Sequence, residues 1–376
     1  METKWTLLKG CTHLFGYKDK DKEFSKWTYD MQKYSLSQIL ELFKEYNITK
    51  VVDLGDELDS AENLNWELNL LDYFWSNIPK EVQKVKVSGN HELVKSSIDR
   101  TYITDTLADF YKEKWGVKVY QYEEVKVGNE TDLYCSHKYI NKLQNLKKKY
   151  RYIYSHIRLS DGNAYYSDEI NITVPKACAK KILLSDIHQH LEFDNIVYSG
   201  ASSWVHFPKT EEEENKLKST PSVVLLNEET GEHKRIELFN ENSPYQKKLR
   251  NLNWDEMFDD EQLENIIEEM RQDSIDNKAF YKVRVYAKKF LLDKIKRLLR
   301  EKDTKGFIKA EYVNLSMNDY KVEKIQFSKI IKQCLDNDSV SKSLLEYIKK
   351  TNDDPNLENL LVSTYATLEG FVGEGK

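Results

Sequence analysis

Apolar residues in the first two-thirds of the chain form short runs that alternate with stretches of helical periodicity. The short runs predict strands at residues 5–8, 50–54, 85–87, 152–154, 181–184, 196–198 and 223–226. The periodic stretches predict helices at residues 36–46 and 67–78. Strands that first alternate with helices and then crowd together favour a layered α/β sandwich, which we assign to residues 1–240.

The pattern changes after residue 240. Residues 241–253 are polar and include Pro244, which predicts a linker. A helix at 260–273, a strand at 279–286, a basic helix at 290–302 and a strand at 308–315 then predict a small α+β domain over residues 254–320. Residues 327–376 form a tail in which two or three short helices are expected, broken near Pro355.

Composition narrows the class of protein. Of the 376 residues, 40% are hydrophobic and 32% are charged, as in globular proteins with a highly charged surface. The four cysteines are scattered without paired spacing, and neither a signal-peptide pattern nor a membrane-length apolar run occurs, so we expect a cytoplasmic protein without a membrane partner. The net charge of -6 argues against a general coat of nucleic acid, although local basic patches can still bind DNA.

Polar motifs follow five of the predicted strands. They are Cys11-Thr12-His13, Gly55-Asp56-Glu57-Leu58-Asp59, Gly89-Asn90-His91-Glu92, Ser155-His156 and Ser185-Asp186-Ile187-His188. Taken singly, each has an ordinary explanation as a turn, a helix cap or a packed histidine. Ligands gather beyond the carboxyl ends of strands in open α/β sheets, so together the motifs predict a metal site. Imidazole, carboxylate and amide groups suit Mn, Fe, Zn or Mg, and two ions ~3.5–4 Å apart can clamp a phosphodiester.

The order of these motifs resembles that of the calcineurin-like metallophosphoesterases, which read Asp-x-His, Gly-Asp-x-x-Asp, Gly-Asn-His-Asp/Glu, His and Gly-His-x-His. GDELD and GNHE match fully, and residues 196–202 are similar to the family's YxGS segment. The motifs look most like those of the SbcD branch and cover the first two-thirds of the chain; the last third is similar in architecture only. The resemblance implies a four-layer β-sandwich with a small α+β capping domain and C-terminal helices.

The resemblance also implies roles for individual residues. His13, Asp56 and His188 would bind one metal ion, and Asp56, Asn90, His156 and Asp186 would bind the other. His91 would be the catalytic histidine that stabilises the transition state or protonates the leaving oxygen, because imidazole exchanges protons near neutral pH. The spacing to Gly200 favours Asp186 and His188 as the last ligand pair, while literal motif matching would select His188 and His190. The expected cofactors are two divalent ions, Mn first, with Mg, Fe or Zn as alternatives.

One position departs from the family pattern. Cys11 stands where the family has its first aspartate. A thiolate can bind metal, but it is softer than a carboxylate and favours Zn or Fe over Mn or Mg. Cys11 is therefore either a metal ligand of unusual kind or a small buried residue beside a weakly held ion.

Basic residues around the expected cleft are candidates for binding DNA. They are Lys147, Lys148, Lys149, Arg284, Lys288, Lys289 and Arg297. The resemblance implies a metal-dependent DNA exonuclease or endonuclease that works with an SbcC-like ATPase of the SMC family, as a homodimer within a heterotetramer. It also implies that the tail helices bind this ATPase. A phosphodiesterase for small substrates and a weakly active or non-catalytic assembly subunit are the alternative functions.

Overall fold

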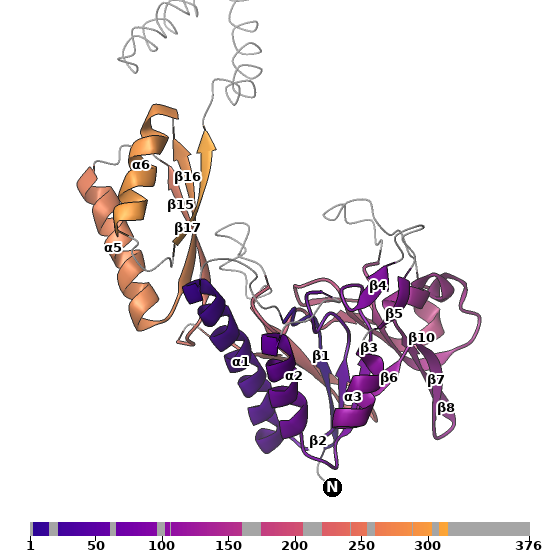
Figure 1. Cartoon of the computed structure of the whole chain (residues 1–376). Coiled ribbons are helices and arrows are strands. Elements are labelled where there is room, and N and C mark those ends of the chain that lie inside the picture. The colour runs from indigo at the N-terminus through magenta and orange to yellow at the C-terminus, as the bar shows by residue number, and fades with distance from the viewer. Residues whose placement is uncertain are drawn as a thin grey trace, which may run out of the picture. The chain divides into compact units, whose positions relative to one another are not determined.

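The computed structural model describes residues 3–14, 22–60, 65–95, 102–105, 107–159, 174–205, 220–240, 242–253, 260–287, 289–302 and 308–314 (Figure 1). The predicted tail at residues 327–376 lies outside the described residues. Among those described, no helix combines the length and apolar character that crossing a membrane requires.

The first of two six-stranded sheets has the order β14-β13-β1-β2-β3-β6. Its strands are β1 (Trp5–Lys9), β2 (Ile48–Asp53), β3 (Gln83–Val87), β6 (Lys118–Tyr120), β13 (Ser222–Leu226) and β14 (His233–Glu237). β1, β2, β3 and β6 are parallel neighbours, whereas β13 runs antiparallel to β1 and β14 antiparallel to β13. The parallel strands therefore end at one edge of the sheet. The helices that follow them are α1 (Lys22–Glu45), α2 (Asn65–Asn77) and α3 (Ala108–Trp115).

The second six-stranded sheet has the order β11-β12-β10-β9-β8-β7. Its strands are β7 (Tyr122–Val127), β8 (Glu130–Cys135), β9 (Tyr150–His156), β10 (Ala179–Ser185), β11 (Leu191–Phe193) and β12 (Ile196–Tyr198). The inner strands β8, β9, β10 and β12 are parallel, and the edge strands β7 and β11 pair antiparallel. The 3₁₀ helices η1 (His137–Asn145) and η2 (Lys176–Cys178) precede β9 and β10, and a separate hairpin joins β4 (Leu93–Lys95) to β5 (Tyr102–Asp105).

Alternating side chains divide the interior into separate cores, because successive residues of a strand point to opposite faces. Leu7 and Val51 pack with residues of α1, α2 and α3, while their neighbours Leu8 and Val52 pack in a core shared with the second sheet. On the far face of the second sheet, Ile153 packs with residues of η1 and η2. The mixed α/β class is thus confirmed, and the described residues that pack on this face include the 3₁₀ helices η1 and η2.

A third sheet, ordered β15-β16-β17, belongs to the predicted α+β part of the chain. It comprises β15 (Lys247–Asn253), β16 (Phe280–Ala287) and β17 (Ile308–Asn314), with α5 (Asp260–Asp276) and α6 (Lys289–Lys302). The prediction of a linker at 241–253 was wrong for its second half, because β15 pairs in parallel with β16 along its whole length. Leu249 and Leu252 are buried there, and these two apolar residues among polar neighbours were too weak a signal. Trp27 of α1 packs on Phe280 with ring centroids 5.4 Å apart.

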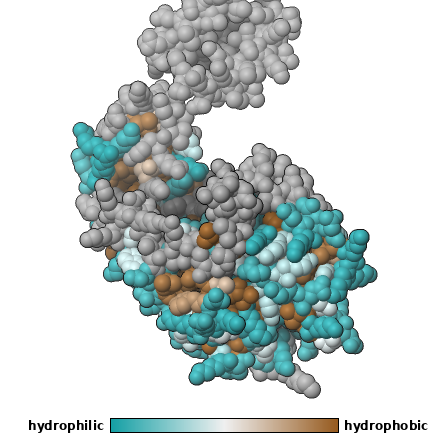
Figure 2. Space-filling view, turned by 45° about the vertical axis from the view of Figure 1, so that its right-hand side comes forward, coloured by the Kyte–Doolittle hydropathy of each residue, from teal (hydrophilic) through white to brown (hydrophobic). Residues whose placement is uncertain are grey.

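The described surface is mostly hydrophilic on the face that Figure 2 shows, with small apolar patches. The large hydrophobic side chains that are exposed, among the residues described, are Trp66, Phe110, Val127 and Ile275. Single exposed apolar residues of this kind are normal on globular proteins and do not by themselves mark an interface.

Glu228, two residues after the end of β13, links two cationic side chains and a hydroxyl group. Its carboxylate lies 2.5 Å from Lys50 Nζ and 2.7 Å from Arg151 Nη2, and it accepts a hydrogen bond of 2.8 Å from Thr6 Oγ1. Burial opposes ionisation of this carboxyl group, but Lys50, Thr6 and Arg151 outweigh burial and hold the pKa of Glu228 at about 2. Because the folded-state pKa is depressed, the stabilisation is complete above the ordinary pKa near 4.5 and is lost as pH falls toward 2.

We therefore expect the wild type to be more stable than a Glu228→Gln variant by about 3 kcal/mol at neutral pH. The difference should shrink progressively between about pH 5 and pH 2, because protonation removes the same charge in the wild type that the substitution removes. Urea unfolding at several pH values measures it, and Glu229→Gln, at an exposed neighbour, controls for loss of one surface charge. A difference that stays constant across this pH range would contradict the prediction.

Candidate metal centre

The predicted ligands from five strands meet at one place. β1, β2 and β3 of the first sheet and β9 and β10 of the second direct their carboxyl ends to it. Three groups of side chains there have ligand atoms within 4.8 Å of one another: Cys11, His13 and His188; Cys11, Asp56 and His156; and His13, Asp56 and His91. Segments more than 170 positions apart in the sequence thus supply one compact set of sulfur, oxygen and nitrogen atoms.

Asp56 lies at the centre of this set. Its Oδ2 atom is 3.0 Å from His156 Nε2, 3.7 Å from His13 Nε2 and 4.0 Å from His91 Nε2. Burial opposes ionisation, but the three imidazoles, His156 foremost, hold the pKa of Asp56 far below its usual range. The main chain is equally fixed, since the Asp56 carbonyl accepts hydrogen bonds from the amides of Thr12 and His13. An ionised carboxylate in this position suits a bridge between two cations.

Two glycines allow the loops to approach so closely. A Cβ atom on Gly89 would lie 2.1 Å from Asp56 Oδ1, and one on Gly55 would lie 2.6 Å from the Gly89 nitrogen. Gly55 also has φ +93, which other residues rarely adopt. The glycines of the GDELD and GNHE motifs therefore serve loop packing, while their neighbours supply the polar groups.

Three of the predicted ligands have strained backbone conformations. His13, Asp56 and Asp186 have φ values of 47°, 52° and 95°. Such left-handed conformations cost non-glycine residues about 1–3 kcal/mol each and persist where the surrounding structure enforces them, often at functional sites. Their gathering around one cluster favours a functional role for it over three independent turns.

His156 provides a test of whether a cation fits here. Its side chain is fully buried, and its Nδ1–H donates to the Leu54 carbonyl at 2.8 Å, which leaves Nε2 to face Asp56. Nε2 has no hydrogen-bond partner, although a carboxylate oxygen lies 3.0 Å away. A nitrogen lone pair and a carboxylate at that distance need a proton or a metal ion between them. In line with this, Asp56 outweighs the effect of burial and raises the pKa of His156 to about 9.

A second close contact in the cluster joins two imidazoles. His13 Nε2 and His188 Nε2 are 3.1 Å apart, and His13 Nδ1 lies 3.1 Å from Asp59 Oδ1. If Asp59 accepts the hydrogen bond from Nδ1–H, as carboxylates do beside metal-bound histidines, then His13 Nε2 offers a lone pair toward His188. The hydrogen bond from His13 also lowers the pKa of Asp59. The donors of both pairs therefore fit a divalent metal ion.

Cys11 is shared by two of the three groups. Its side chain is fully buried, and its Sγ is 3.0 Å from Ser185 Oγ, which also accepts the Cys11 amide hydrogen bond at 3.1 Å. Burial and the negative charge of Asp56 raise the pKa of the Cys11 thiol well above its ordinary value. Of the other cysteines, Cys135 and Cys178 are free and buried, and Cys334 lies outside the described residues.

The remaining predicted ligands are placed less centrally. Asp186 Oδ1 lies 3.9 Å from His156 Nε2 but also 3.2 Å from Arg158 Nη2, so this carboxylate borders the site and forms an ion pair there. Asn90 is half-buried in the loop beside His91. His190 pairs with Glu192 at 2.7 Å, whereas His188 belongs to a compact group. The structure thus places His188 and not His190 beside His13.

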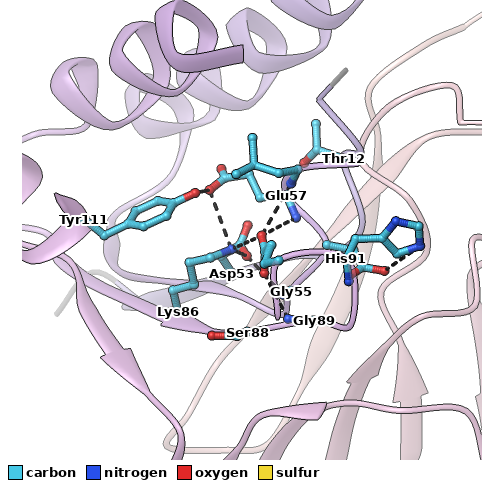
Figure 3. Close-up of polar contacts among 12 residues, drawn as sticks. Thr12, Asp53, Gly55, Glu57, Lys86, Ser88, Gly89, His91 and Tyr111 are labelled. Carbon is cyan, nitrogen blue, oxygen red and sulfur yellow. Dashed lines mark hydrogen bonds and ion pairs between the residues drawn. The ribbon is translucent and has the colours of Figure 1, made fainter. Parts of the chain in front are cut away.

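Beneath the site lies a network of buried charges that the sequence reasoning missed. Lys86 Nζ is 2.7 Å from Asp53 Oδ1 and 2.7 Å from Glu92 Oε1, and Lys9 forms ion pairs with Asp53 and Glu57. All five side chains are almost completely buried. Figure 3 shows Lys86 among these carboxylates, with the Tyr111 hydroxyl donating to Glu57.

The acids of this network hold the loops that carry the metal-site residues. Asp53 accepts the Gly55 amide, and Glu92 accepts the amides of Glu57 and Gly89. Asp56 stands between Gly55 and Glu57 in the chain, and His91 directly precedes Glu92, so the network fixes the backbone on either side of the metal-site residues. From the sequence alone, a lysine in a short strand is assigned to the surface. The signal that could have indicated buried cations was the pair of additional acids, Glu57 and Glu92, in the two motifs.

Three of the candidate DNA-binding residues lie at the far end of β9 from the centre. Lys147, Lys148 and Lys149 are exposed before β9, whose other end carries His156, about 20 Å away along the strand. Arg284 is half-buried in β16, and Arg297 is exposed on α6. Lys288 and the side chain of Lys289 lie outside the described part of the chain.

Comparison with known proteins adds little to what the geometry of the site shows. No protein-family profile and no curated protein matches the chain. Among solved structures, an archaeal protein described as a novel phosphodiesterase is similar, with 12% identity over 62% of this chain and 99% of its own and a TM-score of 0.32. Protein AQ665 of Aquifex aeolicus, of unknown function, has 15% identity over 36% of this chain and 61% of its own, with a TM-score of 0.21. At such scores the assignment of the site rests on its own residues.

Proposed function

We propose that this protein is a metal-dependent phosphodiesterase whose active centre is the cluster around Asp56. The observation that carries the proposal is a pair of close contacts between candidate ligand atoms: His156 Nε2 lies 3.0 Å from Asp56 Oδ2, and His13 Nε2 lies 3.1 Å from His188 Nε2. When bound, divalent ions polarise a phosphoryl oxygen and stabilise the charge that develops during in-line displacement. The carboxylate, imidazole and thiol groups gathered at these distances form a ligand set that fits such ions.

His91 is the residue best placed to contact a substrate directly. Its side chain is 38% exposed, compared with 6% for His13 and 0% for His156. Its Nδ1–H donates to the Asp59 carbonyl at 2.7 Å, and its amide donates to Asp56 at 3.0 Å. The ring is therefore fixed in one orientation, with Nε2 facing the Asp56 side of the site. From there, in the imidazolium form, Nε2–H can donate a hydrogen bond or a proton to a phosphate oxygen.

Within this class we propose DNA as the substrate. The motif order resembles that of SbcD-type nucleases, and Lys296, Arg297 and Arg300 line one hollow on α6 with Glu301. Clustered arginines and lysines bind nucleic-acid phosphates through charge, whatever the sequence. A small diester would gain nothing from such a surface on a separate sheet-and-helix unit, and so this surface favours a polymeric substrate.

The test compares three substrates with protein loaded with Mn or with Zn. We expect hydrolysis of a chromogenic bis-aryl phosphodiester and of linear duplex DNA, with a phosphomonoester cleaved poorly. Asp56→Asn should lose both metal and activity, because it removes the central negative charge. Turnover of the chromogenic diester but not of DNA would instead favour an enzyme for small substrates. Retained metal with no turnover of any substrate would favour a non-catalytic subunit.

We further propose an SbcC-like ATPase of the SMC family as the partner, in a heterotetramer built on a homodimer of this chain. The proposal rests on the family resemblance and on apolar residues at helical spacing in residues 327–376, a pattern suited to docking a helix in a groove. Co-purification of the ATPase with the full chain, and its loss from a chain ending at residue 326, would support this role.

A further inference from the structure

The sulfur of Cys11 lies close to two groups of candidate metal ligands. It belongs both to the group with His13 and His188 and to the group with Asp56 and His156. In each group the ligand atoms lie within 4.8 Å of one another, so the sulfur is close to both pairs of candidate ligands. His156 Nε2, fully buried and without a hydrogen-bond partner, points independently to a ligand at the same place.

The surroundings of the sulfur fit a thiolate bound to metal. Ser185 Oγ accepts the Cys11 amide, which leaves its own hydrogen able to reach Sγ at 3.0 Å. A hydroxyl that donates to a sulfur ligand is the kind of outer-shell contact that orients and tunes metal sites. The same serine lies close to the backbone before Cys11, since a Cβ atom on Gly10 would lie 2.8 Å from Ser185 Oγ.

On this basis we propose that Cys11 is a metal ligand and that the centre selects a thiolate-binding ion, Zn²⁺ or Fe²⁺, over Mn²⁺ and Mg²⁺. This inference rests on the proposed function, because it concerns the metal of the same centre. Sulfur and imidazole ligands suit Zn and Fe, whereas sites of carboxylate, carbonyl and water suit Mg and Mn. With Cys11 included, one group offers a sulfur and two nitrogens and the other a sulfur, an oxygen and a nitrogen.

Cobalt substitution tests the ligand directly, without any measurement of activity. Co²⁺ bound to a thiolate gives a strong charge-transfer absorption in the near ultraviolet, which oxygen and nitrogen ligands do not produce. We expect this band in the wild type and in Cys135→Ser, a matched change at another fully buried cysteine outside the three groups. The band should be absent from Cys11→Ser and Cys11→Asp, with circular dichroism confirming that each variant is folded.

Competition between ions tests selectivity. Apoprotein dialysed against equal Zn²⁺ and Mn²⁺ should retain mainly Zn²⁺, and Cys11→Asp should lower the bound Zn-to-Mn ratio at least about tenfold. Bound Co²⁺ without the charge-transfer band, or an unchanged ratio in Cys11→Asp, would overturn the role of Cys11 while leaving the proposed function intact. If the wild type bound none of these ions, the metal centre itself, and with it the proposed function, would be refuted.

Discussion

Replacement of His91 by alanine is expected to lower the rate of phosphodiester hydrolysis about 10²–10⁴-fold, the usual cost of losing one proton-transferring group. The metal content should remain unchanged, because His91 is the most exposed imidazole of the three around Asp56 and its Nδ1–H already donates to the Asp59 carbonyl. Steady-state rates on the chromogenic diester, measured beside metal analysis of the same samples, check both parts of the prediction.

Two further variants make this result interpretable. Asp56→Ala should lose metal together with activity, since all three imidazoles face its carboxylate. His190→Ala removes a histidine that pairs with Glu192 and belongs to none of the three groups, so it should change neither rate nor metal content. If His91→Ala lost its metal, His91 would be a ligand, as its proximity to His13 and Asp56 allows. A normal rate would exclude any catalytic role for it.

Removing the Lys86 cation is expected to have the largest effect on stability. Lys86 is fully buried between Asp53 and Glu92, and Lys86→Met would leave these carboxylates with only Lys9 to balance them. Breaking a buried ion pair by deleting one partner costs on the order of 3–5 kcal/mol, because the remaining charge is desolvated without compensation. We expect a loss of that size in the free energy of unfolding.

Urea denaturation of the purified apoprotein measures this loss and separates it from any effect on metal binding. Lys44→Met is the matched control, because Lys44 is 73% exposed and its ion pair with Glu41 lies on the surface. Such pairs contribute about 0–1 kcal/mol, so the control should differ little from the wild type. If Lys86→Met lost less than about 1 kcal/mol, the acids below the site would have to be protonated in the native protein.

The burial of these charges also shows where reasoning from the sequence reached its limit. Motif order at strand ends was enough to bring His13, Asp56 and His156 together, because the carboxyl ends of parallel strands share one edge of a sheet. Lys9 and Lys86 could not be recognised, since a lysine in a strand is read as an exposed position unless its partners in space are known. Asp53, likewise, was read as the end of an ordinary strand.

The limits of the fold prediction have a similar origin. The strand β13 was predicted from its continuous apolar run, the pattern of a strand with buried residues on both faces. The edge strand β7 alternates charged and apolar residues with most side chains partly exposed, and was missed. The long helix α1 begins fourteen residues before the predicted helix at 36–46, because its first half interleaves aromatic and lysine residues without a clear apolar stripe.

The place of β1 in its sheet sets the order in which the protein can be built. β1 lies between β2 and β13, and Thr6 pairs with Leu226. Contacts of such high sequence separation form slowly, because the entropy of closing a long loop must be overcome first. During synthesis, β1 must therefore wait for more than 200 further residues before β13 can pair with it. The loop with Cys11 and His13 follows β1 directly, so the strand that carries these two residues gains its second neighbour only after residue 226 has been made.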